Sequence, residues 1–491
     1  MALEPLSLSW LLQLGLAFFL LLFSAAMIFV VRLKPSCGCE TCQTFLTSRW
    51  ALEYNNLCDW YSHLLAKSPT GTIHVHVLGN VITANPENVE HMLKTKFENY
   101  PKGKQFSAIL GDLLGRGIFN VDGDLWRFQR KMACLELGSV SVRSHAFDIV
   151  TSEIESRLVP LLRSSSDFDL QDIFRRFSFD SICRFSFGLD PGCLAPSLPA
   201  CEFAAAFDLA SKLSAERAIA TSPLVWKVKR FLNLGSERRL KQAIRSVHEL
   251  AEGVIRHKRE HGGAHGDLLS RFMGTTDDDV FLRDIVISFL LAGRDTVASA
   301  LTSFFWLLSR NPAVVDAIRE ESDRVIGGDR EETVTFAQLR EMHHLQAAVH
   351  ESMRLFPPVQ FDSKFCENDD VLADGTFVSR GTRVTYHPYA MGRMERIWGE
   401  VPLQFAPERW LENGVFKHKD PFKYPVFQGG IRVCLGKEMA LVEMKAVALS
   451  IIRRFDIEVI GSGQAPKFMP GLTASIRGGL PAIVTVREGR F

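Results

Sequence analysis

The sequence lacks the features that mark several large classes of proteins. Its 57 Lys and Arg residues are balanced by 56 Asp and Glu residues, so no net charge favours nucleic acid or an acidic partner. No internal repeat and no low-complexity tract occurs among its 491 residues, which excludes a collagen-like or disordered chain. Tyrosine is scarce, with 6 residues beside 36 phenylalanines. This excess of apolar aromatic side chains favours a large interior or an apolar pocket.

Long hydrophobic runs are also scarce, and the one uncharged run lies at the N-terminus. Residues 10–31 would form a helix of about 33 Å, enough for a bilayer core of about 30 Å. The alternative is a cleaved signal peptide, whose apolar part is usually about 7–15 residues long and follows positive charge. Here Glu4 precedes the run, and Arg32 and Lys34 follow it. We therefore predict an uncleaved, single-pass anchor with the rest of the chain on the cytoplasmic side.

Two small groups of metal-ligand residues follow the anchor. Cys37, Cys39 and Cys42 cluster in six residues, but structural zinc takes four ligands and no second pair of ligands stands nearby in the sequence. His74 and His76 have a spacing that could serve a metal, yet the polar face of a half-buried strand explains them more simply. We therefore predict a juxtamembrane linker whose thiols are free or acylated.

Two patterns indicate how the rest of the chain folds. In residues 71–84, apolar and polar positions alternate around Gly79-Asn80, which predicts a β-hairpin, and a last strand is expected at residues 482–486. Residues 280–310 form an apolar segment that Pro312 ends and that four charged residues interrupt. This segment is therefore a buried core helix and not a second membrane span.

The domain organisation follows from these patterns. A capping box at Thr335–Gln338 predicts a helix that Pro357 and Pro358 end. No linker divides the helical patterns convincingly. We predict an anchor at residues 1–34, a juxtamembrane linker and first helix at residues 35–70, and a single catalytic domain at residues 71–491.

The segment most informative about chemistry is FQGGIRVCLG, residues 427–436, directly before an apolar-periodic helix. Cys434 at the mouth of that helix would have its thiolate favoured by the helix dipole. The glycines let the backbone pass close to a flat group, and Arg432 can pair with a carboxylate. These properties suit haem iron and its propionates. They are equally compatible with a buried cysteine in a glycine-rich turn.

The sequence of this segment resembles the haem-binding loop of the cytochrome P450 family, Phe-x-x-Gly-x-Arg-x-Cys-x-Gly. The five fixed positions of that loop are matched by Phe427, Gly430, Arg432, Cys434 and Gly436. The resemblance covers nearly the whole chain. It implies a mainly α fold with small β-sheets (α+β), and a bound haem b held by these residues with Cys434 as the axial ligand of the iron.

A second signature lies in the long core helix. Residues 292–296, Ala-Gly-Arg-Asp-Thr, resemble the place where the family activates oxygen, and this implies that Asp295 and Thr296 relay protons. A mid-helix threonine otherwise most often bonds back to its own helix.

Two further signatures concern the structure around the haem. Glu351, Arg354 and Arg409 resemble the family's buried Glu–Arg–Arg cluster, which has a structural role. Each could instead be a separate surface charge, but the i, i+3 spacing of Glu351 and Arg354 among apolar residues favours a buried pair. Trp126 and Arg130 stand four apart on one helical face and resemble a pair that holds a haem propionate. Lys364 falls where family members often carry another propionate-binding base.

The resemblance implies a haem-thiolate monooxygenase of the endoplasmic reticulum membrane. It would use O2 and electrons from NADPH, delivered through the FAD and FMN of NADPH–cytochrome P450 reductase, and act as a monomer without nucleic acid. Two other functions stay open: a haem-thiolate isomerase or dehydratase of lipid hydroperoxides, and a non-catalytic haem sensor. Retention of Asp295 and Thr296 argues against both.

The substrate is narrowed by residues 386–399 and 427–440, which resemble plant enzymes that oxidise fatty acids or jasmonoyl-isoleucine at the ω-end. The sequence does not indicate the chain length of the substrate or whether the ω-carbon or an in-chain carbon is oxidised. It also does not indicate whether the end product is the alcohol or the acid. The residues expected to line the apolar pocket are Phe106, Ile109, Leu113, Ile118, Phe119, Phe289, Leu290 and the segments 359–361 and 472–476. The cations considered for the substrate carboxylate are Arg116, Lys102 and Lys104.

Overall fold

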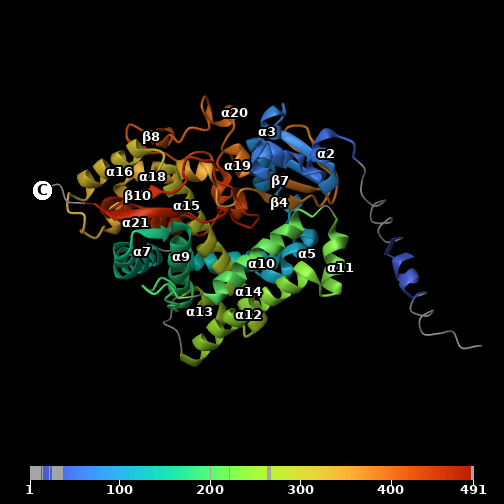
Figure 1. Ribbon diagram of the computed structural model, residues 1–491, viewed down its shortest axis with the longest axis horizontal. Helices are drawn as coiled ribbons and strands as arrows, with labels where there is room; N and C mark the ends of the chain where they lie inside the picture. Colours follow the sequence, from blue (N-terminus) through green and yellow to red (C-terminus); the bar gives the residue numbers. More distant parts are fainter. Residues whose placement is uncertain are drawn as a thin grey trace, which may run out of the picture.

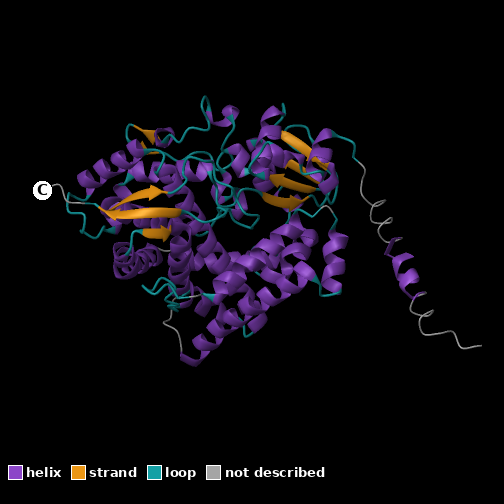
Figure 2. Ribbon diagram, viewed as in Figure 1, coloured by secondary structure: helices purple, strands orange, loops and turns teal. Residues whose placement is uncertain are grey.

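The computed structural model describes residues 37–138, 140–199, 201–220, 222–261 and 267–487, with residues 13, 15–21, 23 and 24 near the N-terminus. Helices form most of the molecule, and the larger sheets lie at two separate places (Figures 1 and 2). The predicted fold class, mainly α with small sheets, is confirmed. The predicted anchor lies mainly outside the described residues; of its span, residues 15–21 are helical.

The longer helices carry most of the chain. The helices of eight or more described residues are α3 Leu57–Lys67, α5 Gly103–Leu114, α6 Gly123–Leu137, α7 Val140–Glu153, α9 Leu170–Phe187, α10 Glu202–Ala218, α11 Pro223–Phe231, α12 Gly235–His261, α14 Asp279–Leu290, α15 Thr296–Leu308, α16 Pro312–Val325, α18 His343–Leu355 and α21 Lys437–Arg454. The shorter ones are α2 Glu40–Leu46, α4 Pro86–Glu90, α8 Val159–Ser164, α13 Leu268–Met273, α17 Phe336–Glu341, α19 Pro388–Met391 and α20 Glu395–Trp398.

The strands form two larger sheets and two short ribbons. The first sheet has the order β1 Thr72–Val75, β2 Asn80–Thr83, β7 Arg383–Tyr386 and β4 Asp362–Phe365. The second has the order β10 Phe455–Val459, β11 Pro481–Val486 and β3 Asp167–Asp169. The ribbons are β5 Asp370–Val371 with β6 Phe377–Val378, and β8 Leu411–Glu412 with β9 Val415–Phe416.

The predicted hairpin is present but shorter than its alternation suggests. Strands β1 and β2 are antiparallel, with Thr72 opposite Thr83. The strand ends at Val75, and the residues His76–Leu78 form a 3-10 turn before Gly79, whose φ of 55° needs a glycine. Strand β7 then joins this hairpin in parallel, which places residues about 300 positions apart in one sheet.

The long apolar segment is a buried core helix, as predicted. It runs from Asp279 to Leu308, 83% of its most apolar part is buried, and among the described residues it is the one helix apolar and long enough to span a membrane. A π-helical turn, η6 Leu291–Asp295, interrupts it at the Ala-Gly-Arg-Asp-Thr motif. A Cβ on Gly293 would overlap the side chain of Ile182, so this glycine lets α9 pack closely against the turn.

The helix predicted from Thr335 to Pro357 is in fact two helices. The capping box is present and opens α17, but Met342 leaves the helical region with ψ of 75°. Helix α18 then begins anew, because Glu321 of α16 accepts hydrogen bonds from the backbone N–H groups of His344 and Leu345, at 2.7 and 3.0 Å. The prediction of one helix was wrong because this cap comes from a residue distant in the sequence.

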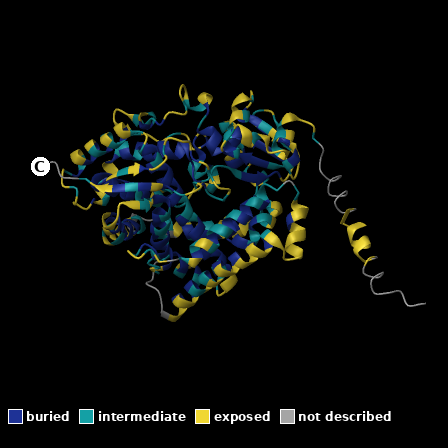
Figure 3. Cartoon of the chain, viewed as in Figure 1, coloured by how far each residue is buried: buried dark blue, intermediate teal, exposed yellow. Residues whose placement is uncertain are grey.

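Several apolar clusters form the core beneath these elements, and Figure 3 shows the buried residues along the chain. The largest apolar cluster joins α15, α18 and α21 to α9, and a second lies among α5, α10, α12 and α14. A third packs α2 and α3 on the first sheet, with Cys42 and Leu65 fully buried. Residues 37–67 are therefore packed on the sheet, and α19 also contacts α3.

Candidate active site

The Cys434 loop precedes α21 and is held by its own backbone. The N–H of Cys434 donates to the carbonyl oxygen of Phe427 at 2.8 Å. Gly430 has a φ of 58°, and a Cβ there would overlap the carbonyl of Leu93. Burial raises the pKa of the Cys434 thiol, while the backbone of Gly436 opposes this rise. The residue nevertheless keeps accessible surface, which leaves room for a ligand at this loop.

Trp126, Arg130 and Arg432 lie together beside this loop. The Arg432 guanidinium lies 4.5 Å from the Trp126 ring centroid, and that of Arg130 lies 5.7 Å from it. Arg130 donates to the Val433 carbonyl at 2.7 Å, while Arg432 pairs with Asp122 at 2.5 Å. Burial lowers the pKa of both arginines. The structure thus brings Arg432 to Trp126 and Arg130, two predicted haem residues about 300 positions away from it in the sequence.

Lys364, the other predicted propionate base, belongs to a buried network. Its amine lies 3.1 Å from Asp362, and the Lys102 amine lies 2.5 Å from the second oxygen of the same carboxylate. Burial alone would raise the pKa of Asp362, but the two lysines hold it well below its usual range. Tyr386 also donates to Asp362 at 3.1 Å. Sequence reasoning missed Asp362, because β4, β7 and the start of α5 meet only in the folded chain.

Thr296 and Asp295 do not face the same surroundings. The Thr296 hydroxyl donates to the carbonyl oxygen of Ala292 at 2.6 Å. Thr296 and Ala292 both line a cavity. Asp295 instead accepts from Arg294 at 2.7 Å, and Arg294 also donates to Asp208 at 2.7 Å. Burial raises the pKa of Asp295, and Arg294 opposes this rise. The hydroxyl therefore borders the cavity, while the neighbouring acid belongs to an ion-pair network.

Glu351, Arg354 and Arg409 form one cluster. Arg354 makes a two-pronged contact with Glu351, with two N–H···O distances of 2.8 Å, and both side chains are fully buried. Arg409 reaches the same carboxylate at 3.3 Å. The indole N–H of Trp410 donates to Glu351 at 2.9 Å, a partner that the sequence did not suggest. Because the carboxylate is paired on all sides, the cluster ties α18 to the segment before β8.

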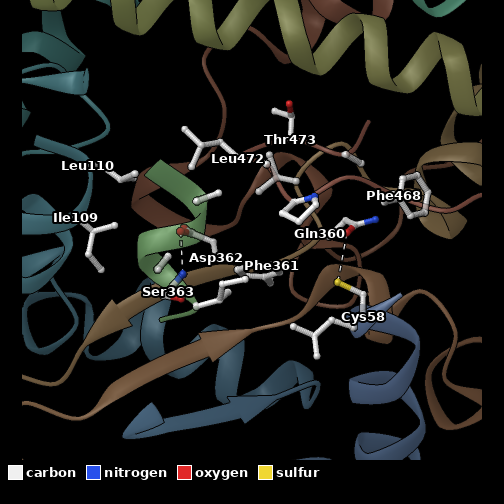
Figure 4. A pocket seen from close by; sticks show the side chains of 18 of the residues that line it. Cys58, Ile109, Leu110, Gln360, Phe361, Asp362, Ser363, Phe468, Leu472 and Thr473 are labelled. Carbon is white, nitrogen blue, oxygen red and sulfur yellow. Dashed lines mark hydrogen bonds between the residues drawn. The ribbon is translucent and has the colours of Figure 1, made fainter. Parts of the chain in front are cut away.

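A cavity of about 460 Å³ lies between α5, the segment around β4 and the loop after residue 467. Figure 4 shows Ile109 and Leu110 from α5 converging with Phe361, Phe468 and Leu472. Most of the predicted lining is confirmed: Phe106, Ile109, Phe119, the segment 359–361 and residues 472–474.

Six residues of the predicted lining do not border the cavity, and others take their place. Leu113, Phe289 and Leu290 are packed in the core, and Ile118, Ser475 and Ile476 are not part of the wall either. The walls are formed instead by other faces of the same helices, with Leu110, Leu114 and Leu291 as lining residues. The sequence alone could not show which apolar side chains of these helices face the cavity and which face the core, because both surroundings are apolar.

The structure also corrects the prediction of which cations could bind a substrate carboxylate. Arg116 pairs with Asp278 at the surface and Lys104 is exposed; neither lines the cavity. Lys102 lines it, but its amine is bound to Asp362. The wall contains two arginines that the prediction omitted, Arg383 and Arg477.

The cytochrome P450 family profile matches residues 56–483. The chain belongs to the cytochrome P450 family. Cytochrome P450 94C1 of Arabidopsis thaliana is 59% identical over 483 residues, with 96% of this chain and 98% of that relative covered. Cytochrome P450 94B1 of Arabidopsis thaliana is 46% identical, and cytochrome P450 94A1 of Vicia sativa is 44% identical. These matches cover 88% and 87% of this chain, and 88% and 86% of the relatives.

A solved structure supports the same fold. The crystal structure of the cytochrome P450DA haem domain aligns with a TM-score of 0.69 at 22% identity, over 83% of this chain and 88% of that one. The chain is thus a P450 monooxygenase, and its family uses haem b and electrons that generally come from a P450 reductase.

Haem b fits the residues around Cys434 in this P450. The Cys434 loop leaves room for a ligand, and the missing side chain of Gly430 lets the loop lie close to Leu93. The buried Nε of Arg432 has no hydrogen-bond partner among the described residues, which leaves a donor for an anionic group. Cys434 would hold the iron, and Arg432, Arg130, Trp126 and Lys364 would hold the propionates. Bound there, the haem supplies the activation of dioxygen.

Proposed function

We propose that this P450 hydroxylates the aliphatic end of a lipid acid, at the ω-position of a fatty acid or of jasmonoyl-isoleucine. The resemblance of residues 386–399 and 427–440 to plant enzymes of that group suggests the substrate class. The proposal rests on one feature of the cavity, a mainly apolar wall that contains two arginines, Arg383 and Arg477, neither of which forms an ion pair with a carboxylate of the described residues. A long aliphatic acid needs this combination, because its chain must leave water and its charge must be paired.

Arg383 is the side chain best suited to the substrate carboxylate. It stands at the start of β7, where its Nε donates to the hydroxyl of Ser363 at 2.9 Å and its Nη1 donates to the carbonyl oxygen of Ala218 at 2.8 Å. Both partners are neutral, and among the described residues no carboxylate forms an ion pair with it. Burial lowers the pKa of Arg383, but a guanidinium remains charged at any physiological pH.

An incoming carboxylate would therefore meet a guanidinium that no carboxylate of the described residues contacts directly, since Asp362 attracts it only from beyond ion-pair distance. The guanidinium has five N–H groups, and the two neutral partners leave donors free. Charge-assisted hydrogen bonds of this kind are stronger than neutral ones. Arg383 would fix the acid end, and the apolar wall would direct the chain toward Thr296, which lines the same cavity.

The chain's own residues supply positioning and a proton. Phe106, Ile109 and Phe361 exclude water around the aliphatic part of the substrate. The Thr296 hydroxyl, anchored on Ala292, can turn to donate or accept a proton at the cavity surface. These residues orient the lipid, and the haem provides the oxidation.

The direct test compares lipid acids with microsomes that contain the protein, a reductase and NADPH. A panel of fatty acids and their amino-acid conjugates should give products hydroxylated at or near the ω-carbon, detected by mass spectrometry. Rapid conversion of a lipid hydroperoxide without NADPH would instead establish the isomerase function. No turnover of any panel member, with haem fully bound, would contradict the lipid-acid proposal.

The role of Arg383 can be tested with a lipid acid and its uncharged methyl ester as substrates. Arg383→Gln should raise KM for the acid about 10- to 100-fold, which is the usual effect of losing a charge-assisted hydrogen bond, and leave KM for the methyl ester little changed. Lys104→Gln, at an exposed lysine outside the cavity, is the control. A larger acid-specific loss in Arg477→Gln than in Arg383→Gln would place the anchor at Arg477 instead.

We also propose that the protein resides in the endoplasmic reticulum membrane, with the catalytic part in the cytoplasm beside its reductase. The uncharged run at residues 10–31, followed by Arg32 and Lys34, supports this. Helix α11 adds an apolar surface, with Val228 55% and Phe231 89% exposed. Deletion of residues 1–34 should release much of the protein from microsomes, and detection of a mature chain that lacks this segment would contradict the anchor.

A further inference from the structure

Three cysteines and a histidine meet where residues 37–42 pack on the first sheet. The sulfur atoms of Cys37 and Cys39 are 3.3 Å apart. These two sulfurs and a ring nitrogen of His76 all lie within 4.8 Å of one another. His76 stands in the short turn between β1 and β2, so the two segments come from opposite sides of the 57–67 helix in the sequence.

Cys42 lies next to this group. Its side chain is fully buried, and its thiol interacts with the thiols of both Cys37 and Cys39. It also contacts the backbone of Val77, the residue after His76. Three ligand atoms therefore lie within 4.8 Å of one another, and a third thiol stands beside them.

We propose that Cys37, Cys39, Cys42 and His76 form a structural zinc site. A tetrahedral Cys₃His set is one of the standard structural zinc sites, and Zn–S and Zn–N bonds of about 2.3 and 2.0 Å place neighbouring ligand atoms roughly 3.5–3.8 Å apart. The separations around Cys39 are close to this range, so small side-chain rotations suffice. All four positions are filled by protein, which is typical of a structural site and not of a catalytic one.

The position of the site suggests its purpose. Residues 37–42 directly follow the predicted anchor, and His76 lies in the turn between two strands of the first sheet. The same sheet contributes β4 and Arg383 to the cavity wall. A metal at this point fastens the chain that leaves the membrane to the rigid sheet. It thereby fixes how the cavity is oriented relative to the bilayer. This role is independent of the substrate.

The chemistry also separates zinc from the other fates of these thiols. In the cytoplasm thiols stay reduced, and zinc takes them as thiolates with release of their protons. A Cys37–Cys39 disulfide would instead need an oxidant, and acylation would need a free, accessible thiol. Either modification would remove ligands from the site, so each excludes zinc and can be recognised by mass.

The test is the metal content of the full-length holoenzyme, purified without chelators. We expect about one zinc per haem iron by elemental analysis, and a zinc-edge X-ray absorption spectrum with three sulfur neighbours and one nitrogen neighbour. His76→Ala and Cys39→Ser should lose most of this zinc. His74→Ala and Cys134→Ser should keep it, since these residues are outside the group. The thiolate-type CO spectrum of each variant reports whether the haem domain is folded.

Several results would overturn the proposal. One is the absence of zinc both as purified and after incubation with Zn²⁺ and a thiol reductant. Another is a Cys37–Cys39 disulfide or an acyl chain in intact-mass spectra of the protein from microsomes. Zinc that remains in His76→Ala and disappears in His74→Ala would show that the assigned histidine is wrong. If Cys42→Ser fails to fold, the exposed His76→Ala variant still decides the question.

Discussion

The hydroxyl of Thr296 donates a hydrogen bond of 2.6 Å to the carbonyl oxygen of Ala292, at the π-helical turn of the core helix. In this turn the backbone is already distorted, and the two residues together line the cavity. The hydroxyl therefore has a fixed acceptor behind it and the substrate space in front of it. Asp295 next to it is turned to Arg294, so the hydroxyl is the polar group of this pair that borders the cavity.

This relationship predicts the effect of Thr296→Ala. The variant should bind haem, CO and substrate like the parent, because none of these needs the hydroxyl. Proton delivery should fail, so hydroxylated product per NADPH consumed should fall about tenfold or more while hydrogen peroxide rises. Thr302→Ala is the matched control, since Thr302 makes the same 2.6 Å bond to Ala298 but is buried away from the cavity. An equal loss of coupling in both variants would remove Thr296 from the mechanism.

Cys434→Ser tests the iron ligand. The variant should lose the absorption band that thiolate ligation gives to the reduced CO complex, and with it all monooxygenase turnover. Cys134→Ser, at an exposed cysteine, should retain both. Retention of the thiolate band in Cys434→Ser would mean that another cysteine binds the iron.

Arg354→Ala tests the buried Glu351 cluster. Removal of the guanidinium would leave the fully buried Glu351 without its two-pronged partner, at a cost of about 3–5 kcal/mol in the free energy of unfolding. Haem-loaded protein should then fail to accumulate. The double variant Glu351→Leu, Arg354→Met should lose less, because no unpaired charge remains. The yield of haem-loaded protein, measured by the CO spectrum, checks both variants, and an equally severe loss in the double variant would contradict the charge argument.

His387 predicts a pH dependence of stability. The side chain is 1% exposed, and its Nδ1 accepts the N–H of Ala390 at 3.2 Å. Burial lowers the pKa of His387 from 6.5 to about 3. Below about pH 6.5 the histidine is therefore protonated in the unfolded chain but stays neutral in the folded chain. The contribution of His387 to the free energy of unfolding is complete above pH 6.5 and is lost as the pH falls toward 3.

The measurement is the unfolding midpoint at pH 7 and pH 5, a range above the titration of ordinary carboxyl groups. His387→Asn keeps an acceptor for Ala390 and cannot be protonated, so it should lose less stability on acidification than the parent. His145→Asn, at an exposed histidine, should behave like the parent. The same acid sensitivity in His387→Asn as in the parent would assign the effect to another group. Burial also lowers the pKa of His350 to about 3, so His350 would be the next residue to substitute.

Much about this protein was determined by the sequence alone. The Cys434 loop, the Ala-Gly-Arg-Asp-Thr motif and the spacing of Glu351 and Arg354 are local patterns, and local spacing decides local geometry. Helical periodicity likewise predicted the core helix, and alternation predicted the hairpin. These features need only a few neighbouring residues to be recognised.

The tertiary structure decided every feature that joins distant segments. It brought Lys102 and Lys364 to Asp362, divided the predicted 335–357 helix through Glu321, and chose which faces of α5 and the core helix line the cavity. It placed Arg383 in the wall, where no sequence pattern had suggested a cation. It also placed His76 beside Cys37 and Cys39, two groups that were each unremarkable alone. The physical reason is the same throughout: a residue's partner across the core is set by packing, and packing has no fixed spacing along the chain.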